Sequence, residues 1–337
     1  MSLFRFFALL LASMSLTVLI ACSTQPPDTA SAPTTAPSPQ SSTMSSMNHS
    51  GKPKININTA ILSQLDKFEA QLGVPALSNK IQASRPYGKP EELVSKNVIT
   101  QAQFDQIKEM VTVEDIALTG EAKDVDYMTK LGLMKGHLLV ARELLDLQKP
   151  AQAEPHIGHP VEEIYADVED QLQERNVKEF KTTLIALQDL VRAGAKDTAK
   201  VNTEFKTSMK AVDDAIAALP EAQRQSPTFV LQVINGLLDT ANSEYGAAIA
   251  NGKITQAIEY QDSRGFVAYA NTLYSGVSAQ VEKDAPETHK DIQQTMAELT
   301  KVWPAPLPPA TPIKTPTQVS QLIKTVEIGT QKAVKTS

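Results

Sequence analysis

The chain has 337 residues and a formal net charge of −6, and apolar residues make up 42% of it, enough to build a core. Aromatic residues make up only 5% and glycine is sparse, which argues against a large β-sandwich or barrel and favours helices. The acidic balance argues against a uniformly basic nucleic-acid binder. The single cysteine excludes an internal disulfide and a cysteine-cluster zinc site.

The first 21 residues have the pattern of a secretory signal peptide. Arg5 is the only charge before an apolar run, Phe6 to Ile20, which is short for a membrane-spanning helix. The end of this segment, Leu19-Ile20-Ala21-Cys22, resembles a bacterial lipobox. The resemblance implies that Cys22 is lipidated and becomes the mature N-terminus. We therefore expect an exported cell-envelope lipoprotein, in the outer membrane or facing the periplasm.

Two segments are predicted to be linkers. Residues 22–53 are rich in serine, threonine and proline and cannot bury enough apolar surface to fold, so a flexible tether is expected. Residues 114–126 are acidic and loosely patterned, and a second linker is expected there.

Residues 54–113 contain short helical patterns separated by turns. Two stretches, Ile55-Asn56-Ile57-Asn58-Thr59-Ala60 and Arg85-Pro86-Tyr87-Gly88-Lys89-Pro90-Glu91-Glu92-Leu93, resemble the tandem helix-hairpin-helix unit of the competence DNA receptor ComEA. The photosystem II extrinsic subunit PsbU is similar. The resemblance implies a small helix-hairpin-helix domain and, in its DNA-binding members, backbone amides that bind phosphate.

The two hairpins depart from the pattern of those DNA-binding members, which read Gly-apolar-Gly. Here they are Gly73-Val74-Pro75 and Asn97-Val98-Ile99, so a proline without an N–H and a bulky β-branched residue replace the second glycine. The charge of the segment is also nearly balanced, whereas phosphate binding needs clustered positive charge. We expect weak or absent DNA binding and a hairpin surface that contacts a protein partner.

Residues 127–303 carry apolar residues at helical spacing throughout, with prolines and glycines at the expected ends of the helices. Short connections predict antiparallel neighbours. A proline-rich segment and a C-terminal helix follow in residues 304–337. The predicted fold is therefore all-α, a small helix-hairpin-helix domain followed by an up-and-down helical bundle.

No nucleophile elbow, phosphate-binding glycine loop or H-E-x-x-H motif occurs, so we expect a protein that is not an enzyme. Three segments of the bundle nevertheless place polar residues near apolar stripes. Together they offer six candidate ligands for a transition metal: His137, His156, His159, Glu163, Glu259 and Asp262. Carboxylate–histidine sites are common in bundle cores, and imidazole suits zinc, copper or iron.

A structural interpretation of the same residues is favoured. In it, His159 caps a helix that opens at Pro160, and Asp262 pairs with Arg142 or Arg264 inside the bundle. The three segments also resemble those of an uncharacterised bacterial lipoprotein group, which implies no function. The expected function is thus that of a lipid-anchored, non-enzymatic binding or scaffold protein with a protein partner and no cofactor. Two alternatives stay open: a ComEA-like DNA-binding protein in DNA uptake, and a metal-binding helical bundle.

Overall fold

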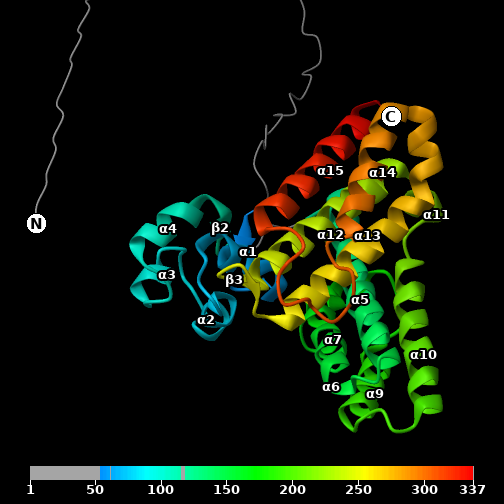
Figure 1. The fold of residues 1–337 in the computed structure, drawn as a ribbon, viewed down its shortest axis with the longest axis horizontal. Coiled ribbons are helices and arrows are strands. Elements are labelled where there is room, and N and C mark those ends of the chain that lie inside the picture. The colour runs from blue at the N-terminus through cyan, green and yellow to red at the C-terminus, as the bar shows by residue number, and fades with distance from the viewer. Residues whose placement is uncertain (1–53, 61, 115–117, 337) are drawn as a thin grey trace, which may run out of the picture. The chain divides into compact units, whose positions relative to one another are not determined.

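The computed structural model describes residues 54–60, 62–114 and 118–336 (Figure 1). The predicted signal peptide, Cys22 and the tether lie outside the described residues. The all-α prediction is confirmed, because helices form nearly all of the regular structure and the strands are only two residues long. Within the described ranges, no helix combines the length and the apolar character that crossing a membrane requires.

The N-terminal segment has its own small core. Strand β1 (Ile55–Asn56) pairs in parallel with β2 (Val111–Thr112), and between them lie α1 (Leu62–Leu72), α2 (Leu77–Ala83), α3 (Glu92–Ser95), α4 (Gln101–Ile107) and a 3-10 turn (Lys108–Met110). Thr100 begins α4 with a capping box completed by Gln103. The core residues include Leu65, Phe68 and Phe104.

Helix α5 (Gly120–Asp146) begins six residues before the predicted end of the second linker, so that linker is shorter than expected. The first turns of α5 are polar, and two of their acidic side chains form ion pairs. Asp124 pairs with Arg175 at 2.5 Å and Asp126 with Lys130 at 2.8 Å. The central part of α5 is continuously buried from Leu131 to Leu138.

After α5 the chain forms α6 (Pro150–Ala153), α7 (Pro155–His159), a π-helical turn (Pro160–Ile164), α8 (Tyr165–Glu174), α9 (Lys181–Arg192), α10 (Thr198–Ile216) and α11 (Glu221–Arg224). The expectation that His159 caps a helix opened by Pro160 is wrong. His159 has helical dihedrals and makes no side-chain cap, because α7 continues through the π-helical turn into α8. A π-helical turn of this kind is frequent at functional sites.

The C-terminal part contains four long helices: α12 (Pro227–Ala247), α13 (Ala257–Asp284), α14 (Pro286–Thr300) and α15 (Pro316–Thr336). A hairpin of β3 (Ile249–Ala250) and β4 (Lys253–Ile254) joins α12 to α13, with Asn251 and Gly252 at φ 53° and 72° in its turn. Helices α14 and α15 pack side by side (Figure 1). One continuous apolar core joins these helices to α5 and to α7–α10.

Candidate metal centre

Three helical segments bring a carboxylate and two imidazoles together inside the bundle. His137 lies in the middle of α5, His159 ends α7, and Asp262 lies in the second turn of α13. Each side chain offers one ligand atom, and all three atoms lie within 4.8 Å of one another. We call these residues the triad. Helices α5 and α13 come close enough for this because Gly136 and Gly265 face each other where they meet.

The ligand atoms of the triad lie close to one another. Nδ1 of His137 is 2.6 Å from Oδ1 of Asp262, and Nδ1 of His159 is 3.4 Å from Oδ2. Yet within the described part of the chain neither ring nitrogen of His137 has a hydrogen-bond partner of acceptable geometry, although the side chain is 0% exposed. A fully buried imidazole without a partner is costly, which makes His137 the orphaned donor or acceptor of this site.

The surroundings set the charges of the triad. Burial lowers the pKa of His137, so its ring is neutral and offers a lone pair. Burial opposes the ionisation of Asp262, but the imidazoles of His137 and His156 outweigh it and hold the pKa of this carboxyl well below its usual range. Burial also opposes protonation of His159, but Asp262, Glu163 and Glu259 raise its pKa to about 9. At neutral pH His159 is therefore protonated, and a metal ion would have to displace that proton. Once it is lost, the site offers an ionised carboxylate and two imidazoles, a donor set that suits a transition-metal ion.

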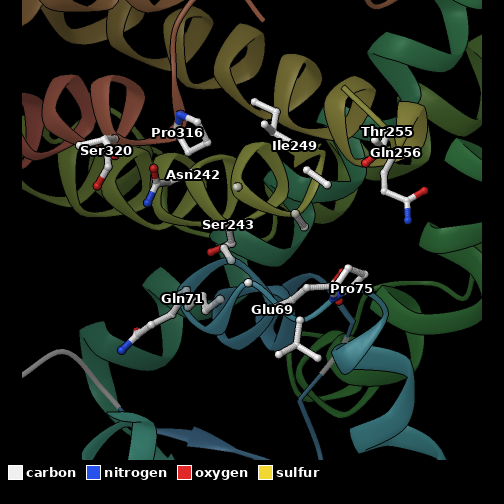
Figure 2. Close-up of a pocket in the computed structure, with 18 of the residues that line it drawn as sticks. Glu69, Gln71, Pro75, Asn242, Ser243, Ile249, Thr255, Gln256, Pro316 and Ser320 are labelled. Atoms are coloured by element: carbon white, nitrogen blue, oxygen red, sulfur yellow. The ribbon is translucent and has the colours of Figure 1, made fainter. Parts of the chain in front are cut away.

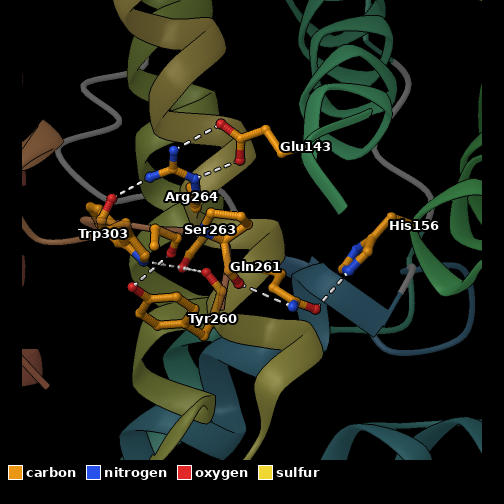
Figure 3. A network of polar contacts seen from close by, with 9 residues as sticks. Glu143, His156, Tyr260, Gln261, Ser263, Arg264 and Trp303 are labelled. Carbon is orange, nitrogen blue, oxygen red and sulfur yellow. Dashed lines mark hydrogen bonds and ion pairs between the residues drawn. The ribbon is translucent and has the colours of Figure 1, made fainter. Parts of the chain in front are cut away.

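His156 supports the triad without being part of it. Figure 3 shows the contact of its ring with the side chain of Gln261. Nδ1 of His156 is 2.6 Å from Oδ1 of Asp262 and its Nε2 is 2.9 Å from Oε1 of Gln261. The amide of Gln261 in turn donates to the carbonyl of Pro306 at 3.1 Å. His156 thereby helps to fix the carboxylate through the same oxygen, Oδ1, that His137 faces, as residues next to metal ligands commonly do. Gln261 was not singled out in the sequence, because nothing in its spacing distinguishes it from a surface glutamine.

The pairing predicted between Asp262 and an arginine is wrong. Arg264 points to the other side of α13, where it forms a bidentate pair with Glu143 at 2.7 and 2.8 Å and donates to the carbonyl of Trp303 (Figure 3). Arg142 instead contacts Asn202 and Asp146. Because neither arginine faces the triad, the ion-pair partners of Asp262 among the described residues are histidines.

The remaining two candidates, Glu163 and Glu259, lie beside the triad. Both carboxylates are half-buried and act electrostatically on His159. Neither contributes an atom to the cluster of mutually close ligand atoms in the described residues. Thus the structure brings together three of the six predicted ligands as the triad. His156 contacts the triad without belonging to it, and Glu163 and Glu259 lie beside it.

The predicted hairpin residues form no comparable site. At the first hairpin the amides of Gly73 and Val74 donate to the carbonyl of Glu69. At the second, the amides of Val98 and Ile99 both donate to the carbonyl of Leu93. Since these N–H groups are already used, they cannot surround a phosphate as the Gly-apolar-Gly hairpins do.

A separate pocket of about 690 Å³ lies between the turn after α1 and the helices α12 and α15 (Figure 2). Its lining combines apolar side chains such as Val74 and Ile249 with amide and hydroxyl groups such as those of Asn242 and Ser243. None of the triad residues lines it. The buried metal centre and this pocket are therefore distinct features of the chain.

Residues 220–337, about a third of the chain, match the protein family described as the iron permease-associated 4-helix bundle domain. The four long helices α12 to α15 lie within this range, and α13 carries Asp262. His137 and His159 lie before the matched residues. No curated protein and no solved structure is similar to the chain at a significant level.

The match corrects several expectations from the sequence. It points to an iron permease-associated bundle, whereas the resemblances suggested a ComEA or PsbU unit and an uncharacterised lipoprotein group. It also overturns the interpretation as a lipid-anchored scaffold and the alternative of a DNA-binding protein in DNA uptake. The simple alternative of a metal-binding bundle was closer but lacked the link to a permease.

The coarser expectations agree with the match. A protein partner at a membrane and an exported or membrane-associated location are supported. The match gives no support to a lipid anchor, to an outer-membrane location or to DNA as a partner. The lipidation of Cys22 therefore stays an untested prediction.

Proposed function

We propose that this protein is an accessory component of membrane iron uptake that holds a ferrous ion on His137, His159 and Asp262 for an iron permease. The observation that carries the proposal is His137, a fully buried imidazole whose two nitrogens have no hydrogen-bond partner in the described residues and whose Nδ1 faces an ionised carboxylate. An ion bound at the triad gives that lone pair its partner.

The donor set supports iron as the cargo. Two histidines and one carboxylate that leave further positions open form a set characteristic of non-haem Fe(II). The carboxylate belongs to α13, inside the residues that match the iron permease-associated family. The proposed chemistry is binding and release, so the chain needs no nucleophile or general base.

The openness of the site suits release of a cargo ion. His137 and Asp262 are 0% and 2% exposed, but the side chain of His159 is 31% exposed. An ion held by the triad can therefore exchange on the side of His159, whereas a permanently structural ion would be enclosed on all sides.

An anaerobic calorimetric titration of the full chain with Fe(II) tests the proposal. We expect one ion per chain, and we expect His137→Ala and Asp262→Asn to lower the affinity at least a hundredfold. The matched control is His289→Gln, because His289 is a buried histidine that contacts Tyr274 at 2.9 Å, outside the triad. Absence of iron binding by the wild-type chain, or equal affinity of the triad variants, would contradict the proposal.

A second experiment addresses the partner. The chain and an iron permease from the same organism are co-expressed, and the permease is purified in detergent. We expect the chain to co-purify with it and expect iron uptake by the cells to fall when Asp262→Asn replaces the wild type. Unchanged iron uptake with a stable, folded variant would show that transport does not need the metal centre and would contradict the proposal.

A further inference from the structure

Two half-buried acidic side chains lie near His159, the exposed member of the triad. Glu163 follows His159 by one helical turn, and Glu259 precedes Asp262 by three residues on α13. Both act electrostatically on His159, the exposed member of the triad. Within the described residues neither carboxylate is in a salt bridge with a lysine or arginine, whereas Asp126, Asp213 and Glu143 are.

The acids around the triad repel one another. Burial raises the pKa of Glu163 and of Glu259. Asp66 on α1 has its pKa raised to about 7, first by burial and then by Glu69, Glu259 and Glu163. Half-buried carboxylates that repel one another gain most from a cation among them.

The basic groups nearby do not neutralise this region. Arg85 acts on Glu163, but its guanidinium donates to the backbone carbonyls of Ile57 and Ala60. Lys67 is engaged in an ion pair with Asp239 of α12. Thus no lysine or arginine of the described residues forms a salt bridge with the two acids, and the cation that acts on both of them is the triad member His159.

The two acids are placed to guide an ion, not to hold it. The group of mutually close ligand atoms contains only the triad, so Glu163 and Glu259 do not complete a second set of ligands. One carboxylate oxygen of Glu163 also accepts a 3.4 Å hydrogen bond from the amide of Leu62 at the start of α1. The fully buried member of the triad is His137, whose ring nitrogens have no hydrogen-bond partner in the described residues.

We propose that Glu163 and Glu259 form an acidic entrance that attracts a divalent cation from solvent and passes it to His159 and then to the buried triad. This inference rests on the proposed function. Clefts lined by charge of one sign raise association rates by 10- to 1,000-fold, and the effect weakens with ionic strength. The entrance acts on the rate of loading, whereas the triad determines how tightly the ion is held.

Stopped-flow mixing of the full chain with Fe(II), without oxygen, tests the entrance. We expect the double variant Glu163→Gln/Glu259→Gln to bind Fe(II) at least ten times more slowly at low salt, with a weaker dependence on ionic strength. The dissociation rate should stay within about threefold of wild type. The control Glu169→Gln/Asp170→Asn removes the same charge from exposed positions on α8 and should leave the association rate within twofold.

The outcomes separate the entrance from the metal centre. Unchanged association in the double variant overturns the entrance while leaving the triad in place, and a much faster dissociation overturns it too, because the acids would then be ligands. If the wild-type chain binds no Fe(II), both proposals fail. Should the double variant melt at a lower temperature, the single variants Glu163→Gln and Glu259→Gln are compared instead, and each should slow association by a smaller factor.

Discussion

Gly136 of α5 and Gly265 of α13 face each other so closely that a Cβ on Gly265 would lie 2.2 Å from the carbonyl oxygen of Gly136. A Cβ on Gly136 would lie 3.0 Å from the backbone of Gly265. Each glycine lies next to the site, since His137 follows Gly136 directly and Asp262 precedes Gly265 by three residues. The absence of two side chains therefore brings the imidazole and the carboxylate within bonding distance of one ion.

Gly265→Ala should destabilise the bundle and disrupt the metal centre. The added methyl group meets backbone, which cannot move aside cheaply, so we expect a loss of about 1–3 kcal/mol in the free energy of unfolding. The separation of α5 from α13 should also weaken Fe(II) binding at least tenfold. Urea denaturation and anaerobic titration measure the two effects.

Gly276→Ala is the matched control on the same helix. A Cβ at Gly276 would meet nothing within 4 Å. Because alanine is the better helix former by about 0.5–1 kcal/mol, this variant should be as stable as the wild type or slightly more stable. Equal behaviour of the two alanine variants would show that the helix crossing does not depend on Gly265.

Much of the fold follows from local patterns that can be read in the sequence. The apolar spacing from Val201 to Leu219 predicts α10, and Gly252 marks the turn after α12. These elements follow from periodicity and turn chemistry, which are properties of neighbouring residues. The prediction of a linker at 114–126 was wrong from Gly120 onward, where α5 begins. The acids of this segment find partners such as Arg175, which lies far along the chain.

The metal centre could be predicted only as a set of candidates. The sequence shows that His137 and Asp262 interrupt apolar stripes, but not which way Arg264 turns on its helix. That choice depends on Glu143, which lies on α5 and offers both carboxylate oxygens to the guanidinium. Nor does the sequence show that α5 and α13 touch at their glycines, because helix contacts of this kind depend on tertiary packing.

His156 should matter for iron affinity although it does not belong to the triad. His156→Ala removes the donor that holds Oδ1 of Asp262 and leaves Oε1 of Gln261 without its partner. Loss of such an outer-shell contact typically lowers metal affinity 10- to 100-fold, and we expect that range for Fe(II) in anaerobic titration. His156→Gln keeps an N–H donor and should recover part of the affinity. Equal affinities of the alanine variant and the wild type would contradict this role.

Arg264 should stabilise the attachment of the segment after α14 to α13. Its guanidinium joins Glu143 to the carbonyl of Trp303, and the indole of Trp303 donates to Ser263 at 2.7 Å (Figure 3). Arg264→Met removes the charge-assisted bonds, so we expect a loss of about 1–3 kcal/mol in urea denaturation.

Lys210→Met provides the comparison for Arg264. Lys210 and Asp214 form an ion pair one helical turn apart on α10, with side chains 74% and 64% exposed. Exposed pairs of this spacing contribute only about 0.3–0.5 kcal/mol, and salt screens them. A similar loss of stability in both variants would mean that the contacts of Arg264 stabilise the fold no more than an exposed ion pair does.

Asp66 should make the stability of the chain depend on pH. Burial and the neighbouring acids raise its pKa in the folded chain from 3.8 to about 7. The folded state therefore keeps a proton that the unfolded state has already lost between these values. The resulting stabilisation is complete below pH 3.8 and is lost as the pH rises to about 7.

Asp66→Asn should consequently gain stability over the wild type, by about 1–3 kcal/mol more at pH 8 than at pH 5. Urea denaturation at both pH values measures this, with Asp105→Asn as a control, because Asp105 is an exposed acid on α4. If the difference between Asp66→Asn and wild type is the same at both pH values, Asp66 does not carry a raised pKa, because an asparagine cannot titrate and only the wild type can change.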